Sequence, residues 1–350
     1  MDMHCIDPTQ DERWEQFLHT HPQASLFHSS AWLKALHATY GYQPLLFTTC
    51  APGQPITNGI PFCRIQSWIT GPRLVSLPFS DHCQLLFDPN EASRTISEFL
   101  PSLLEREHCN YVEIRSISSD VSWLRQTGFA QSATFIHHSL DLRPPLPSLF
   151  DRLHKSCFQR KIVRAEKEGL TYSEGNNDEL LQRFYSLQIV TRRRHGAPPQ
   201  PMAWFRNLRD SLGDTLKIRV ASKNERPIAS IVTVRYKDTL IYKYGCSEMA
   251  FHKLGPMPFL FWRAIQRAKA EGAAQFDLGR SDIGQAGLIA FKDHLGATAT
   301  PLSYHRYHAA TAKRSGFSAF MKRPHISAMS AHLPAILLRA ASNIFYRHMA

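Results

Sequence analysis

One pattern occurs twice in this chain: a strand that ends in Arg-Ser, then a loop, a short helix and a glycine. The first copy spans Asn110–Gly128 and the second spans Ala273–Gly296. A glycine that follows a helix can adopt the left-handed conformation that ends it, so both copies read as complete strand–loop–helix units. A 350-residue chain with one such unit in each half is predicted to fold as two related α/β lobes.

The differences between the two copies indicate where function lies. The loop of the second copy is three residues longer, and Asp277 and Lys292 stand where the first copy has Val112 and Leu124. Lys292 is the leading catalytic candidate, because its ammonium could neutralise a phosphate or a developing oxyanion. Asp277 lies inside an apolar strand and is expected to be buried with a hydrogen-bonded or ionic partner. Asp282, in the loop, could take a proton from an acceptor amine or simply stabilise a turn.

The order of predicted elements gives the domain boundaries. The Pro-rich stretch Arg143–Pro147 is typical of a stiff linker. We therefore predict lobes at residues 1–145 and 146–308, each with a mixed, mostly antiparallel sheet flanked by helices, and a tail at 309–350. The stretch "FHSSAWLKALHATYG" predicts a helix that is capped by Ser29 or Ser30 and ends at Gly41.

Composition narrows the partners and the compartment. The net charge of +12 and the pI of about 9.5 favour polyanions such as RNA, nucleotide phosphates or an anionic membrane surface. Seven scattered cysteines without a CxxC pair indicate a reduced, cytoplasmic compartment. The 18 histidines form no HExxH pattern and accompany no cysteine cluster, so no metal site is expected. No signal peptide or membrane span is expected either.

The C-terminal tail is basic, with no Asp or Glu from His294 onward. Its segment "LPAILLRAASNIFYRHM" predicts an amphipathic helix. Such a helix would either attach to the inner face of an anionic membrane or dock back on the protein.

Several motifs occur in an order that resembles a known family. They are "FHSSAWLKAL", "RKIVRAEKEGL", "TRRRHG" and "FDLGRSD" followed by "GLIAFKDHLGA". Together they resemble the FemAB-like and BioF2-like acyltransferases of the GNAT superfamily, over roughly residues 25–305. The resemblance implies two tandem GNAT-like lobes and transfer of an acyl group to an amine. Some members use acetyl-CoA or another acyl-CoA, the Fem branch uses aminoacyl-tRNA to extend a cell-wall precursor, and other relatives occur in exopolysaccharide synthesis.

The loop that holds the acetyl-CoA pyrophosphate in GNAT enzymes reads Gln/Arg-x-x-Gly-x-Gly/Ala. The matching stretch runs from His252 to Met257, and of its key positions only Gly255 agrees. Pro256 and Pro258 also remove two backbone donors from the following helix. The departures argue against ordinary acetyl-CoA binding, and the lack of a long heptad run argues against the coiled-coil arm of tRNA-binding Fem proteins. The candidate cofactor-binding residues are Lys253, Gly255 and Met257.

Cations near helix and strand ends form the candidate substrate site. They could clamp a nucleotide, a sugar diphosphate or tRNA, although a solvated helix face or a helix C-terminus accounts for many such cations. His195 could act as a general base near neutral pH. Asp81 stands at a strand end in the first lobe. The candidate substrate-binding residues are Arg160, Lys161, Arg164, Arg193, Arg194, Arg280 and Asp81.

Tyr242 and Tyr244 alternate with a lysine on a predicted strand, so both side chains are expected on one face. One phenol, for which we take Tyr244, would protonate the leaving group, as a tyrosine often does in GNAT enzymes.

These features predict an N-acyltransferase that acts on an amine of a cell-envelope or exopolysaccharide precursor. Transfer would be direct, without a covalent intermediate, with acyl-CoA as co-substrate and no metal. One alternative is an aminoacyl-tRNA-dependent Fem-type transferase. Another is a catalytically idle GNAT-like binding protein in a polysaccharide-synthesis assembly.

Overall fold

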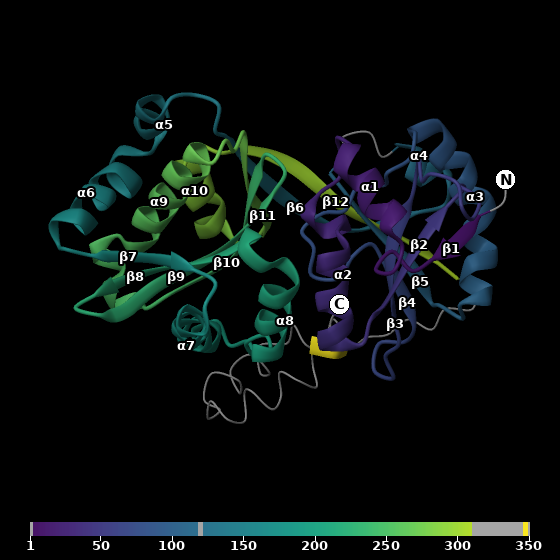
Figure 1. Ribbon diagram of the computed structural model, residues 1–350, viewed down its shortest axis with the longest axis horizontal. Coiled ribbons are helices and arrows are strands. Elements are labelled where there is room, and N and C mark those ends of the chain that lie inside the picture. Colours follow the sequence, from purple (N-terminus) through teal and green to yellow (C-terminus); the bar gives the residue numbers. More distant parts are fainter. Residues whose placement is uncertain (1–2, 118–121, 310–345, 349–350) are drawn as a thin grey trace. The chain divides into compact units, whose positions relative to one another are not determined.

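The computed structural model describes residues 3–117, 122–309 and 346–348, and these residues form two compact units (Figure 1). The second unit holds Ile136–Thr300, and the first holds the chain before and after it. The borders therefore lie within two strands, not at the predicted residues 145 and 308. The Pro-rich stretch begins inside the second unit, where the Leu142 N–H donates to the Ala274 carbonyl at 2.9 Å.

The first unit is a sheet with strand order β1-β2-β3-β4-β5-β12 and helices on both faces. Strands β4 and β5 pair in parallel, whereas the pairs β1–β2, β2–β3, β3–β4 and β5–β12 are antiparallel. Its elements are β1 (His4–Ile6), α1 (Glu12–Thr20), α2 (Ser30–Tyr40), β2 (Gln43–Thr48), β3 (Ile60–Ile65), β4 (Arg73–Val75), α3 (Pro89–Arg106), β5 (Tyr111–Ser116), α4 (Ser122–Gln126), and the later part of β12 (Thr298–His308).

Helix α2 confirms the predicted caps. The Ser29 hydroxyl accepts from the Trp32 N–H at 3.2 Å, and Gly41 ends the helix in the left-handed conformation with φ of 70°. The segment 82–88 forms no strand and makes only two isolated bridges. Its polar groups bind side chains instead: the Ser116 hydroxyl donates to the Gln84 amide oxygen.

The second unit has strand order β6-β11-β10-β9-β8-β7, in which β10 and β11 are parallel and the pairs β10–β9, β9–β8 and β8–β7 are antiparallel. Helices α6, α9 and α10 cover one face, and α7 and α8 cover the other (Figure 1). Its elements are β6 (Ala130–Asp141), α5 (Leu146–Arg152), the π-helical turn η2 (Lys155–Gln159), α6 (Arg160–Lys167), β7 (Thr171–Gly175), α7 (Asp178–Arg194), α8 (Met202–Leu212), β8 (Leu216–Lys223), β9 (Arg226–Tyr236), β10 (Thr239–Ser247), the 3₁₀ turn η4 (Met249–Leu254), α9 (Pro256–Ala270), β11 (Gln275–Asp282) and α10 (Ala286–His294).

The structure confirms that both copies of the sequence pattern form a strand followed by a helix. The first copy forms β5 and α4, the second forms β11 and α10, and a long strand follows each helix. The two α/β units with mixed sheets agree with the predicted tandem architecture.

Two predictions concerned membranes. Within the described residues, no helix has the length and apolar character needed to cross a bilayer. The predicted amphipathic helix of the tail falls mostly on residues 310–345, outside the described ones. The described end, Tyr346–His348, forms a 3₁₀ turn in the first unit, where the Tyr42 hydroxyl donates to the Tyr346 carbonyl at 3.0 Å and the Arg73 guanidinium to the His348 carbonyl at 3.0 Å.

Candidate functional site

Lys292 is buried at the end of β11, not exposed as most lysines are. Its side chain reaches from α10 to the strand end, where Nζ donates to the Gly279 carbonyl at 2.9 Å and the Arg280 carbonyl at 3.1 Å. The residue is 2% exposed. Because a buried ammonium is costly without partners, these carbonyls explain how the unit tolerates the charge. The arrangement fixes one positive charge beside the β11–α10 loop.

Asp277 is buried with hydrogen-bonding partners, as predicted. Its Oδ1 accepts from the Gly279 N–H at 2.7 Å and from Nε2 of His137 at 2.8 Å. His137 lies on β6, the strand beside β11 in the sheet, although it is 140 residues away from Asp277 in the sequence. The sequence analysis missed His137, because only sheet register brings the two residues together.

Asp282 lies at the exposed end of β11. Its carbonyl accepts from the Gln285 N–H at 2.9 Å, which closes the turn that leads into α10. Ile283 beside it is 58% exposed. Asp282 itself is exposed as well, so this strand end is open to solvent.

A basic cluster, which we define as Lys161, Arg194 and His252, forms at the end of β10. The Thr191 hydroxyl in the last turns of α7 accepts from the Ser247 N–H at 3.0 Å and so ties α7 to the strand end. His252 follows in η4, and its Nε2 lies 2.8 Å from the Ser247 hydroxyl. Partial burial lowers the pKa of His252, and the charges of Arg194 and Lys161 lower it further. The charges of Arg194 and Lys161 thus both act on His252, and this concentration of positive charge suits an anion.

The first turn of α9 offers this anion few backbone donors. Gly255 caps the helix with φ of 76°, and Pro256 and Pro258 have no N–H. Of helix positions 256–258, only Met257 retains an N–H. A Cβ on Gly255 would lie 2.5 Å from the Lys161 carbonyl, so the glycine allows α6 to approach α9 closely. Lys253 is exposed beside the basic cluster. Side-chain cations are therefore better placed than backbone amides to hold a phosphate here.

The prediction that Tyr242 and Tyr244 share one face is wrong. Tyr242 pairs with Thr233 and Tyr244 with Val232, so a β-bulge leaves one extra residue between the tyrosines. Tyr242 packs on Phe261 of α9, with ring centroids 4.9 Å apart. Tyr244 instead packs on the α7–α8 side and accepts a 2.8 Å hydrogen bond from Trp204 Nε1. Since the Tyr244 hydroxyl oxygen accepts this bond, the hydroxyl proton is not used in the contact with Trp204.

The remaining candidates are dispersed. His195 caps the end of α7, where partial burial and then Arg194 and Arg192 lower its pKa. Arg193 is exposed on the same helix end. On α6, Arg160 and Arg164 are also exposed, as a solvated face would be.

Asp81 belongs to the first unit. Its carbonyl accepts from the Tyr304 hydroxyl at 2.7 Å.

A second group that the sequence analysis missed consists of His154, Cys157 and His294. Their potential ligand atoms lie within 4.8 Å of one another. The His-x-x-Cys spacing was a readable signal, but His294 is too distant in sequence to complete the pattern.

Comparisons with known proteins agree with this architecture. Residues 154–292 match the family described as "Acetyltransferase (GNAT) domain". A UDP-N-acetylmuramoylpentapeptide-lysine N(6)-alanyltransferase of Weissella viridescens is 25% identical over 96 residues, which make up 27% of this chain and 29% of that protein. The match thus spans less than a third of the relative's length.

Solved structures show the same fold. A crystal structure of FemX superposes with a TM-score of 0.70 at 13% identity, covering 92% of this chain and all of that one (100%). A tandem GNAT protein from the clavulanic acid biosynthesis pathway gives a TM-score of 0.56 at 11% identity, covering 89% of this chain and 100% of its own.

Proposed function

We propose that the chain is a member of the FemAB-like GNAT family and moves an acyl or aminoacyl group directly onto an amine of a cell-envelope or exopolysaccharide precursor. The observation that carries this proposal is the coincidence of two charged features at one sheet edge. Strands β10 and β11 run parallel, so their C-terminal ends lie on the same side of the sheet. The basic cluster lies at the end of β10, and Lys292 lies at the end of β11.

Each end would serve one part of the reaction. The basic cluster would hold the phosphates of the donor, with Lys253, Gly255 and Met257 beside it and Arg160, Arg164 and Arg193 adding positive potential. The Lys292 charge would stabilise the oxyanion that forms when the amine attacks the donor carbonyl. Direct attack needs the amine unprotonated and close to the carbonyl, and no covalent enzyme intermediate.

Proton transfers would fall to the exposed or half-exposed groups. Asp282 would accept the proton of the attacking amine, with His195 as the alternative base. The Tyr244 hydroxyl, which already accepts a bond from Trp204, would donate its proton to the leaving group. Arg280 and Asp81 would contact the acceptor.

Acyl-CoA is the proposed donor, since the matched domain is an acetyltransferase domain. Aminoacyl-tRNA is a second candidate on a specific observation. The first turn of α9 lacks the run of backbone N–H groups that would cradle a pyrophosphate, and the curated relative is named as an alanyltransferase acting on a lysine of a pentapeptide precursor. We also propose a cytoplasmic location with the basic tail at the inner membrane face.

A binding experiment tests the donor. Purified full-length protein is titrated with acetyl-CoA, a longer acyl-CoA and a charged tRNA at two salt concentrations. We expect saturable binding of one donor class. A variant that combines Lys161→Ala with Arg194→Ala should bind that donor about tenfold more weakly or worse, because each substitution removes a charge-assisted contact. Lys167→Ala, which removes an exposed cation of α6 outside the basic cluster, is the matched control and should bind normally.

The outcomes separate the alternatives. CoA binding would establish a thioester donor, whereas tRNA binding with a steep salt dependence would establish the Fem-type donor. Failure to bind any of the three would overturn the enzyme proposal in favour of an idle binding protein. Lys292→Met should then distinguish catalysis from binding, since it is expected to abolish transfer while leaving donor affinity unchanged.

A further inference from the structure

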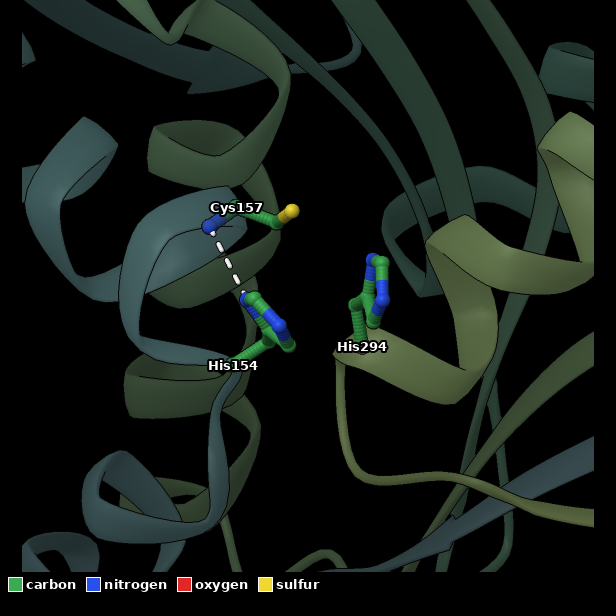
Figure 2. A group of neighbouring side chains, drawn as sticks. All are labelled: His154, Cys157 and His294. Carbon is green, nitrogen blue, oxygen red and sulfur yellow. Dashed lines mark hydrogen bonds between the residues drawn. The ribbon is translucent and has the colours of Figure 1, made fainter.

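Three side chains from two distant parts of the second unit converge near its surface (Figure 2). His154 precedes the π-helical turn η2, Cys157 lies within that turn, and His294 ends α10. The two imidazole rings are 4.2 Å apart between centroids, and the thiol of Cys157 points toward the side of His294 (Figure 2). His154 is exposed, and the other two residues are half-buried. The group is therefore open to ions from solvent.

The backbone, and not the flexibility of the side chains, brings these residues together. The His154 N–H donates to the His294 carbonyl at 2.8 Å, which joins the two segments directly at the cluster. Beneath it, the rings of Phe158 and Phe291 pack with centroids 4.9 Å apart. Gly296 lies against the backbone of Arg152, where a Cβ would be 3.5 Å from the carbonyl oxygen. The positions of the three side chains are thus set by packed, hydrogen-bonded elements.

The donor set and its spacing fit a particular class of ion. The ligand atoms lie within 4.8 Å of one another. Around tetrahedral zinc, with bonds of about 2.0–2.3 Å, ligand atoms are roughly 3.3–3.7 Å apart. Side-chain rotations that move the ligand atoms by about 1 Å would bring them from the observed spacing to the spacing around zinc. Imidazole nitrogens and a thiolate are ligands that zinc prefers, whereas calcium and magnesium prefer oxygen.

One ligand nitrogen already has the required lone pair. Nδ1 of His154 accepts a hydrogen bond from the Cys157 N–H at 3.2 Å, so this nitrogen carries no proton (Figure 2). An ion bound at Nδ1 would replace that capping bond and the 3.4 Å contact between Nδ1 and the Ser156 hydroxyl. His294 lies in the last turn of α10, where the negative end of the helix dipole favours a cation.

We propose that His154, Cys157 and His294 bind one zinc ion, with one coordination position left for water or another ligand. The thiol proton would pass to solvent as the zinc–sulfur bond forms. His294 follows Lys292 by two residues, so the ion would tie the helix that carries Lys292 to the chain that leads into α6. This inference is independent of the proposed donor and acceptor, and it departs from the prediction of no metal site.

The test is a metal titration of the full-length protein, kept reduced and first stripped with a chelator. Zinc is titrated in competition with a chromophoric indicator, and cobalt is used as a spectroscopic probe. We expect one equivalent of zinc to bind and to raise the unfolding temperature. Cobalt should produce a near-ultraviolet thiolate-to-metal charge-transfer band.

Four variants make the assignment specific. Cys157→Ser should abolish the charge-transfer band, and His294→Gln should weaken zinc binding at least about 100-fold. His154→Asn should weaken it similarly while keeping an acceptor for the Cys157 N–H, which separates ligation from capping. Cys50→Ser, at another half-buried cysteine, should leave binding unchanged.

Each alternative result would overturn the proposal. These are the absence of stoichiometric zinc binding, a cobalt spectrum without the thiolate band, or equal affinity in Cys157→Ser and Cys50→Ser. Circular dichroism of every metal-free variant shows whether the fold is retained, so that a loss of binding can be assigned to the ligand.

Discussion

At the scale of single residues, His28 is a buried titratable group with a fixed tautomer. Nδ1 accepts from the Ser25 N–H at 3.1 Å, so Nε2 carries the proton and donates to the Gln84 carbonyl at 2.9 Å. The side chain is fully buried (0% exposed), and burial lowers its pKa from 6.5 to about 4. The folded first unit therefore holds a neutral histidine where the unfolded chain would hold a cation at mildly acidic pH.

This shift predicts that stability falls as the pH is lowered from about 6.5 to about 4. In that window the unfolded chain binds a proton that the folded state does not, so protonation favours unfolding. The full effect is about 3 kcal/mol in the free energy of unfolding. Urea unfolding followed by tryptophan fluorescence at several pH values measures it.

Variants identify the group responsible. His28→Gln keeps a side-chain N–H but does not titrate, so its stability should depend less on pH in this window. His19→Gln, at an exposed histidine of α1, should retain the dependence of the unmodified protein. An unchanged slope in His28→Gln would show that other groups cause the acid sensitivity.

At the scale of elements, a glycine lies just outside each end of α9, and the two glycines have the same positive φ but different surroundings. Gly255 and Gly272 each have φ of 76°. A Cβ on Gly272 would meet nothing within 4 Å, whereas one on Gly255 would lie 2.5 Å from the Lys161 carbonyl. The pair separates the cost of a left-handed residue from the cost of a steric clash.

Gly272→Ala is therefore expected to destabilise the protein by about 1 kcal/mol, the cost of a side chain in the left-handed region. Gly255→Ala should cost about 3 kcal/mol, because α6 must also move away from α9. Urea denaturation of both variants provides the comparison. Equal losses would mean that the contact between α6 and the start of α9 relaxes freely.

The boundaries of helices and strands follow mostly from local sequence, but the sheet face to which a strand side chain points does not. In the tight turns that follow β8 and β9, Asn224, Glu225 and Lys237 adopt the positive φ typical of hairpins. The prediction that Tyr244 points to the same face as Tyr242 is wrong, because the bulge between the two residues depends on pairing with β9. Alternation along one strand cannot reveal an extra residue that only the partner strand defines.

At the scale of the whole molecule, the two units exchange strands. The strand that follows the repeat copy of one unit runs on into the sheet of the other unit. Strand β6 follows the first copy, and its later part lies beside β11 in the second unit. Strand β12 follows the second copy, and its later part pairs with β5 in the first unit. There, Arg306 donates to buried Glu113 at 2.6 Å.

A chain ending at Thr300 should therefore lose stability in the first unit while the second keeps its fold. Strand β5 would lose β12, one of its two partner strands, and the Glu113 carboxylate would lose Arg306 while keeping the Arg115 guanidinium. Hydrogen exchange should show faster exchange in β5 and little change in β8 and β9. Equal loss of protection in both units would contradict the independence of the second unit.

The sequence by itself determined the repeat, the two α/β units, the capped helices and the burial of Asp277, because periodicity, caps and turns act over a few residues. Tertiary structure alone decided which distant groups meet. His137 reaches Asp277 through sheet register, Lys292 binds carbonyls of the strand before its own helix, and His294 meets His154 where α10 ends. These contacts depend on how elements pack across more than a hundred residues or around a loop, and no local pattern records that geometry.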